Sequence, residues 1–186
     1  MKPLIILAGG FGTRLRAIVS DVPKPLAPVG DRPFITYLIN NWINQGVTDF
    51  IFLLHFEAEK IIKELNELSF HISNSDLRFR FLVEKTPLGT GGAILNAIKY
   101  FDLKHGFLVA NADTWLGSGI QQLSSSNSAE IASVLVADTS RYGSLNLSGN
   151  HIISFNEKAI SGGPGHVNSG LYHLLPEIFE GLYGEE

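Results

Sequence analysis

The sequence predicts an α/β protein in which a mostly parallel sheet lies between two layers of helices. Between residues 4 and 110, short apolar runs typical of buried strands alternate with amphipathic segments typical of helices. After residue 130, this alternation is replaced by a succession of strand-like segments. Together, the two patterns predict a three-layer α/β/α arrangement whose mixed sheet gains antiparallel strands in its C-terminal half.

The first half supplies the expected parallel strands and the helices that connect them. Pro33 opens the first helix, because proline is tolerated in the first helical turn, and Gly46 ends it. A second amphipathic helix is expected over residues 57–68, and a third, capped by Thr90, extends to Phe101. The strands of this half are expected at residues 4–7, 50–54, 78–83 and 106–110.

The second half is dominated by strands and turns. Residues 148–150, Ser-Gly-Asn, predict a turn between two neighbouring strands. The serine-rich stretch 124–128 is expected to be an exposed loop after a short helix, and another short helix follows Pro176. The strands of this half are expected at residues 131–137, 144–147, 152–155 and 167–174.

Composition excludes several classes of protein. The 186 residues suit one domain, and a content of 45% hydrophobic and 17% charged residues is typical of a globular chain. A net charge of −4 argues against a general nucleic-acid binder, and the absence of cysteine excludes disulfides and thiolate zinc sites. Only five apolar residues precede the first glycines, which is too short for a signal peptide or a membrane span. We expect a cytoplasmic protein without membrane contact, and leave open whether it forms a homo-oligomer.

The most informative motif is the glycine segment Ala8–Leu15, which follows the first strand directly. Its glycines let backbone N–H groups approach an anion closely, and Arg14 and Lys24 add two cations to the same region. The segment lacks the G-x-x-x-x-G-K-[ST] pattern of a P-loop, and Leu15 weakens the match to the dinucleotide fingerprint. A plain connecting turn would not require Arg and Lys at these positions. We therefore predict a polyphosphate site.

Two further features lie where strands are expected to end. Asp113 follows the strand at 106–110, at the sheet edge where ligands bind in open α/β sheets. It could cap the next helix, but beside a phosphate loop a carboxylate is a natural ligand for Mg²⁺. The second glycine cluster, 87–92, could be ordinary entry into a helix, or it could let a base or a ribose lie against the backbone.

The run Gly9-Gly10-x-Gly12-Thr13-Arg14-Leu15, followed by Pro23-Lys24-Pro25, resembles the signature of the sugar-1-phosphate nucleotidylyltransferases. The segments 87–92, 141–143 and 155–158 also match the family, and the resemblance extends from residue 4 to about residue 180. It is nearest to the single-domain guanylyltransferases of mannose 1-phosphate and heptose 1-phosphate, although the choice of guanine rests on overall likeness. The resemblance implies a Rossmann-like fold and the substrates of this family, a nucleoside triphosphate and a sugar 1-phosphate.

The resemblance also assigns roles to individual residues. It places Arg14 at the pyrophosphate, Lys24 at the α-phosphate, and Asp113 at a catalytic Mg²⁺ ion. The expected nucleotide contacts are Leu7, Ala8, Gly9, Gly10, Gly12, Thr13, Glu84, Gly89, Thr90 and Gly91. The expected contacts to the sugar phosphate are Gly143, Glu157, Lys158 and Asn168. Glu157 and Lys158 could instead be a solvated surface pair. Ser169 stands where the family often has glycine, so a close approach of the backbone to the sugar is left open.

The implied reaction transfers a nucleotidyl group to a sugar 1-phosphate and releases pyrophosphate. One alternative is a uridylyl- or thymidylyltransferase of another sugar 1-phosphate. Others are a molybdopterin or sialic-acid nucleotidyltransferase and an inactive regulatory homologue that binds a nucleotide sugar. The Pro-Lys-Pro segment argues against the molybdopterin and sialic-acid enzymes, and Arg14, Lys24 and Asp113 together argue against an inactive homologue.

One element of the family pattern is not found in the sequence. The family completes its metal site with a second aspartate on a strand near the carboxyl terminus, whereas no acid beyond Asn168 follows a strand in that way. We therefore expect residues 1–186 to be a single nucleotidyltransferase domain that lacks its C-terminal strand and helix. The alternative is a lineage that holds the metal through Asp113 and the nucleotide alone.

Overall fold

The computed structural model describes residues 1–10, 22–72, 75–156 and 162–182. Within them, eight strands form one sheet in the order β5-β4-β1-β6-β10-β8-β9, with β7 also paired to β10. The four strands from the first half are β1 (Leu4–Leu7), β4 (Asp49–Leu54), β5 (Arg78–Val83) and β6 (Phe107–Asn111). They pair in parallel, with β1 between β4 and β6. The carboxyl ends of these strands therefore meet at one edge of the sheet.

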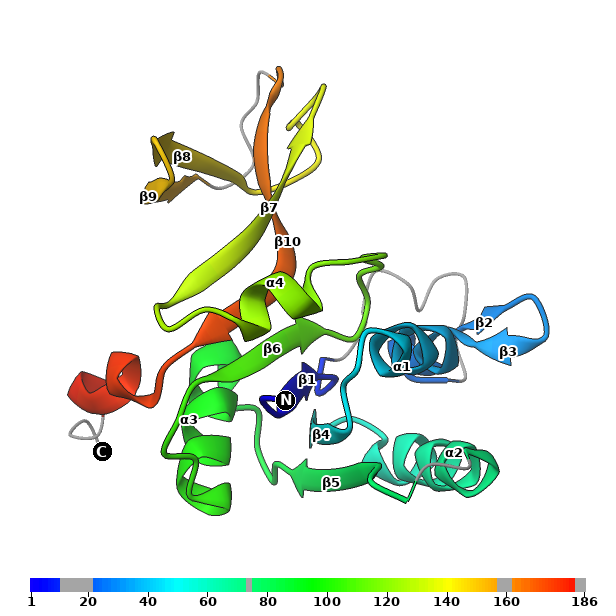
Figure 1. Ribbon diagram of the computed structural model, residues 1–186. Coiled ribbons are helices and arrows are strands. Elements are labelled where there is room, and N and C mark those ends of the chain that lie inside the picture. Colours follow the sequence, from blue (N-terminus) through cyan, green and yellow to red (C-terminus); the bar gives the residue numbers. More distant parts are fainter. Residues whose placement is uncertain (11–21, 73–74, 157–161, 183–186) are drawn as a thin grey trace.

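The strands of the second half are all added in antiparallel pairs. They are β7 (Glu130–Val136), β8 (Ser144–Ser148), β9 (His151–Asn156) and β10 (Gly165–Leu174). β10 pairs with β6 in the main body and with β7 and β8 further along its length. Figure 1 shows β10 running from the main body to the separate part that holds β8 and β9. The predicted mixed sheet, parallel first and antiparallel later, is confirmed.

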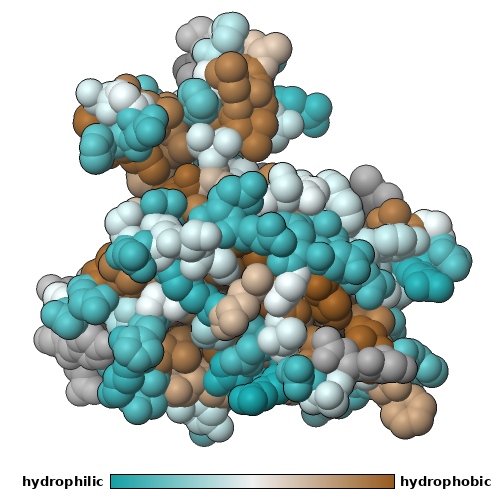
Figure 2. Space-filling model, in the orientation of Figure 1, coloured by the Kyte–Doolittle hydropathy of each residue, from teal (hydrophilic) through white to brown (hydrophobic). Residues whose placement is uncertain are grey.

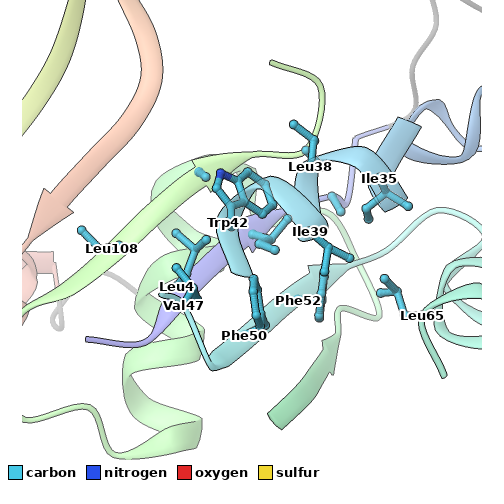
Figure 3. Packing of buried hydrophobic residues seen from close by; sticks show 14 of the residues in the cluster. Leu4, Ile35, Leu38, Ile39, Trp42, Val47, Phe50, Phe52, Leu65 and Leu108 are labelled. Atoms are coloured by element: carbon cyan, nitrogen blue, oxygen red, sulfur yellow. The ribbon is translucent and has the colours of Figure 1, made fainter. Parts of the chain in front are cut away.

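Helices cover both faces of the parallel part. One core lies between the sheet and α1 (Phe34–Asn44), α2 (Ala58–His71) and α4 (Ile120–Ser124). Figure 3 shows Trp42 and Ile39 of α1 close to Phe50 and Phe52 of β4. The opposite core lies under α3 (Gly89–Phe101), where Ala97 meets Ile5 and Val109 of the sheet. Leu4 and Ile6 thus serve one core and Ile5 the other, as the alternation of a strand buried on both faces requires.

The helix boundaries confirm most of the local predictions and correct one. α1 follows Pro33, and Gly46 just beyond its end has a φ of +95°, a conformation that glycine adopts without steric cost. Thr90 does not cap α3, because Leu88 occupies the N-cap position and Thr90 lies inside the first turn. The Glu84 side chain, described below, accepts a hydrogen bond from the backbone N–H of Leu88, the N-cap residue itself.

Short elements missed by the sequence patterns complete the fold. They are the 3₁₀ turn η1 (Lys24–Leu26) and the hairpin of β2 (Pro28–Val29) and β3 (Arg32–Pro33). The short helix expected after Pro176 is the 3₁₀ segment η2 (Pro176–Leu182). Figure 2 shows apolar surface on the upper part of the molecule. Leu135 of β7 and Ile153 and Phe155 of β9 are exposed. In the described ranges, every helix is too short or too polar to cross a membrane.

Candidate functional site

The glycine segment starts at the carboxyl end of the central strand β1. The Ala8 backbone N–H donates to the carbonyl oxygen of Leu53 over 3.0 Å, which extends the pairing of β1 with β4. Gly9 packs against His55, whose Cβ would be 3.4 Å from a Cβ added to Gly9. A Cβ on Gly10 would meet no described atom within 4 Å, so the backbone there is open to a ligand. Gly12, Thr13 and Arg14 lie outside the described residues.

A cavity of about 350 Å³ lies at this edge of the sheet. Its size falls within the range of small-molecule sites in proteins. Its lining combines the ends of β1, β4 and β6 with the loop that enters α3. The lining residues are Leu7, Gly9, Gly10, Leu53, Glu84, Pro87, Gly89, Thr90, Ala93, Asn111 and Asp113. The structure thus brings together segments that are more than 100 residues apart in the chain.

Most of the described residues predicted to contact a nucleotide line this cavity. Ala8 is buried and Gly91 lies within the first turn of α3, and neither is part of the lining. The sequence analysis missed Asn111, which ends β6 two residues before Asp113. Asn111 could have been predicted as a site residue from its position at a strand end, because it shares the sheet edge with Asp113.

Glu84 is held at the entrance to α3 by three hydrogen bonds. Its backbone N–H donates to the carbonyl oxygen of Leu54 over 2.8 Å, and its own carbonyl oxygen lies 2.9 Å from Nδ1 of His55. Its Oε2 accepts a 3.3 Å hydrogen bond from the backbone N–H of Leu88. His55, to which the sequence assigned no role, therefore supports both the glycine segment and Glu84. Glu84 lines the cavity, and one of these three hydrogen bonds is made by its carboxylate.

Lys24 and Asp113 form an ion pair beside the cavity. Nζ of Lys24, the first residue of η1, contacts Oδ2 of Asp113, and both side chains are about 40% exposed. The other carboxylate oxygen of Asp113, Oδ1, accepts a 3.1 Å hydrogen bond from the Thr114 hydroxyl. Two residues that the sequence placed in catalysis are therefore adjacent. Lys24 also has a structural partner, which the sequence did not indicate.

The donor set around Asp113 suits a metal ion that is shared with a phosphate ligand. Among the residues that the structure describes, no three His, Cys, Asp or Glu side chains gather into a metal-binding cluster. Mg²⁺ is commonly held in proteins by one or two carboxylates, with phosphate oxygens and water completing its shell. A single, partly exposed carboxylate at the wall of a cavity fits that type of site.

Two of the four residues predicted to contact the sugar, Gly143 and Asn168, are among the described residues. Gly143 precedes β8, where an added Cβ would lie 3.5 Å from the carbonyl oxygen of Asn156. Asn168 is an exposed residue of β10. Ser169 is buried, and its hydroxyl donates to the carbonyl oxygen of Ala132 over 2.6 Å. The Ser169 side chain therefore points away from the exposed side of the strand. Glu157 and Lys158 lie outside the described residues.

The turn before Gly143 carries a perturbed carboxyl group. The backbone N–H of Ser140 donates to Oδ1 of Asp138 over 2.9 Å, and the Ser140 hydroxyl donates to Oδ2 over 2.8 Å. These two hydrogen bonds lower the pKa of the Asp138 carboxyl, because they stabilise its ionised form. Asp138 therefore orders the segment that leads to Gly143.

Comparisons with known proteins agree with this arrangement. Residues 3–186 match the family model described as nucleotidyl transferase. The chain is 36% identical over 178 residues to the D-glycero-α-D-manno-heptose 1-phosphate guanylyltransferase of Campylobacter jejuni, covering 94% of this chain and 76% of that protein. It is 31% identical over 189 residues to the mannose-1-phosphate guanyltransferase of Aspergillus fumigatus, covering 97% of this chain and 51% of that protein.

A solved structure gives the same result for the fold. HddC from Yersinia pseudotuberculosis, crystallised with GMP-PN, superposes with a TM-score of 0.84 at 37% identity, covering 100% of this chain and 81% of that one. The family model covers nearly the whole chain, and the fold matches this solved structure over its full length. The chain therefore belongs to the nucleotidyl transferase family.

Proposed function

We propose that this chain transfers a guanylyl group from GTP to a manno-configured hexose or heptose 1-phosphate, giving a GDP-sugar and pyrophosphate. The observation that carries the proposal is the Lys24–Asp113 ion pair beside a cavity lined by the glycine segment. A cation, a carboxylate and glycines at one sheet edge are suited to bind a nucleoside triphosphate and its metal ion. The names of the relatives supply the guanylyl group and the manno configuration.

The chemistry follows from the charges. An oxygen of the sugar phosphate attacks the α-phosphorus of GTP, the P–O bond to the β-phosphate breaks, and pyrophosphate leaves with the electron pair. The nucleophile is already an anion, so no general base is required. The enzyme must instead reduce repulsion between two anions and stabilise the leaving group.

Each cation has one place in this scheme. Lys24 turns from Asp113 to the α-phosphate, Arg14 binds the leaving pyrophosphate, and Lys158 binds the sugar phosphate. Asp113 would hold Mg²⁺, which would supply positive charge to the reacting phosphates. The remaining contacts to the sugar are assigned to Gly143, Glu157 and Asn168. GTP as substrate also favours a cytoplasmic location, where nucleoside triphosphates are supplied.

Glu84 gives a chemical reason for guanine. An ionised carboxylate only accepts hydrogen bonds, and it binds best to two parallel N–H donors. Among the common bases, guanine alone presents two adjacent donors, N1–H and the N2 amino group, on its pairing edge. Uracil and thymine place carbonyl oxygens on both sides of their single N–H, which a carboxylate would repel. The carboxylate of Glu84, a residue that lines the cavity, therefore favours GTP.

The test combines each of GTP, ATP, UTP, CTP and TTP with mannose 1-phosphate, D-glycero-D-manno-heptose 1-phosphate and glucose 1-phosphate. Products are identified by mass, and pyrophosphate release gives the rates. The proposal expects GDP-sugars from the two manno-configured substrates at the highest kcat/KM. A preference for another base or for glucose 1-phosphate would contradict it. Binding of a nucleotide sugar without turnover of any pair would support the inactive homologue instead.

A further inference from the structure

The strand that carries Asn168 contains an irregularity next to the cavity. On the ladder between β10 and β7, Asn168 pairs with Ser133 and Tyr172 pairs with Ile131. Three residues of β10 therefore lie opposite one residue of β7, Ala132. Such bulges occur often beside active sites, where they change the direction of a side chain.

The bulge brings two side chains together that a regular strand would hold apart. Residues four positions apart on a straight strand are separated by about 13 Å. Here, Nδ2 of Asn168 donates a 2.8 Å hydrogen bond to the hydroxyl oxygen of Tyr172. Gly170, between them, has a φ of +75°, which only glycine adopts readily. The buried Ser169 hydroxyl bonds to Ala132 and holds the bulge from the opposite side.

These contacts determine how the amide of Asn168 is oriented. The backbone N–H of Gly170 donates to Oδ1 of Asn168 over 2.9 Å. Because a backbone N–H can only donate, the oxygen must face Gly170 and the nitrogen must face Tyr172. Each amide atom still has one hydrogen-bonding position, and Asn168 is exposed. An adjacent donor and acceptor of this kind complement two neighbouring sugar hydroxyls.

Tyr172 is suited to hold this orientation rigidly. Its ring packs against the core beneath α3, and its backbone pairs with Val109 of β6. The bulge also packs close to a residue of the cavity wall, because a Cβ added to Gly170 would lie only 2.6 Å from Nδ2 of Asn111. Asn111 lines the cavity together with Asp113. The amide of Asn168 is thus connected to the nucleotide site through Gly170.

We propose that Tyr172 is a positioning residue for the sugar 1-phosphate, because its hydroxyl fixes the amide of Asn168 in the orientation that binds the sugar hydroxyls. The proposal rests on the function given above, in which Asn168 contacts the sugar. Tyr172 itself does not touch the reacting phosphates. Its loss should affect the binding of the sugar substrate and leave the binding of GTP unchanged.

Four proteins test this role: the wild type, Tyr172→Phe, Asn168→Ala and the double variant. The KM for each substrate is measured while the other substrate is present at a saturating concentration. Because Tyr172→Phe loses one hydrogen bond, its KM for the sugar 1-phosphate should rise about threefold to tenfold. The KM for GTP should stay within about twofold of the wild type. In the Asn168→Ala background, removing the Tyr172 hydroxyl should have no further effect.

The controls separate positioning from general damage. Tyr100→Phe removes another tyrosine hydroxyl, from a side chain that is 67% exposed on α3, and should change neither KM. An unchanged KM for the sugar in Tyr172→Phe, or an equal rise in both KM values, would overturn the proposal. So would a further rise when Tyr172→Phe is added to Asn168→Ala.

The proposed function can fail separately. If the wild type prefers another nucleotide or sugar 1-phosphate, the guanylyl assignment is wrong, and the same four proteins are measured with the preferred pair. The pattern of KM values then decides the role of Tyr172 by itself. A wild type that turns over no pair overturns both proposals.

Discussion

Lys24 and Asp113 neutralise each other beside the cavity, although 89 positions separate them in the chain. Lys24 begins the short turn η1, whereas Asp113 follows β6, so the ion pair joins two segments at the edge of the sheet. An exposed pair of this kind contributes little to stability, about 0 to 1 kcal/mol. The pair therefore matters more for what each partner can bind than for the fold.

We predict that Lys24→Ala lowers kcat far more than it lowers stability. The loss of one preorganised cation at the reacting phosphates reduces the rate by about a hundredfold or more. The melting temperature should change by only a few degrees, because the pair is partly exposed. Lys63→Ala, on the exposed side of α2, is the matched control and should leave kcat unchanged. Near-normal kcat in Lys24→Ala at saturating substrates would remove Lys24 from the mechanism.

Asp113→Asn should abolish activity and weaken metal binding. The amide keeps the shape of the side chain but loses the charge that holds a divalent cation. We expect excess EDTA to inactivate the wild type and Mg²⁺ to restore it. Binding of Mn²⁺ in the presence of GTP, followed by electron paramagnetic resonance, should be weaker in Asp113→Asn than in the wild type. Full activity of the wild type in EDTA would exclude this role.

Mn²⁺ binding measured without GTP tests whether the Lys24–Asp113 ion pair restricts access of a metal ion to the carboxylate. Oδ2 of Asp113 contacts Lys24 in this structure, so a metal ion must compete with the lysine for that oxygen. Lys24→Ala should therefore bind Mn²⁺ more tightly than the wild type when no nucleotide is present. Equal affinities would mean that the ion pair does not restrict access to the carboxylate.

Glu84→Gln should reduce the preference for GTP. Glutamine can still accept the hydrogen bond from the Leu88 N–H, so the loop before α3 should keep its shape. It loses the negative charge and one acceptor, which weakens the pairing with the two N–H donors of guanine. We expect kcat/KM for GTP relative to UTP to fall by about tenfold or more. Glu67→Gln, exposed on α2, should leave this ratio unchanged.

The sequence predicted the order of the main elements because their signals are local. The apolar run of β1 and the helix between Pro33 and Gly46 depend on period, proline and glycine, which are visible in a few neighbouring residues. Thr90 misled for the same reason. Threonine is a common N-cap, but here the helix already starts at Gly89, and Leu88 takes the N-cap position.

The candidate site was predicted less completely, because its contacts join distant segments. The glycine segment and Asp113 could be identified from residue type and position at strand ends. The ion pair of Lys24 with Asp113 and the support of Glu84 by His55 depend on the final packing. The pattern of apolar and polar residues does not predict the bulge in β10, because the bulge is defined by the pairing of β10 with β7.

Gly170→Ala should destabilise the protein and disturb the site together. A side chain at this position meets two obstacles, a φ of +75° and Nδ2 of Asn111 at 2.6 Å from the added Cβ. The expected loss is about 1 to 3 kcal/mol in the free energy of unfolding, measured by urea denaturation. Gly149→Ala is the matched control, because its φ is +59° but an added Cβ meets no described atom within 4 Å. It should show the cost of the backbone conformation alone, about 1 kcal/mol. If Gly170→Ala loses no more stability than Gly149→Ala, the contact between Gly170 and Asn111 is not tight enough to connect Asn168 with the wall of the cavity.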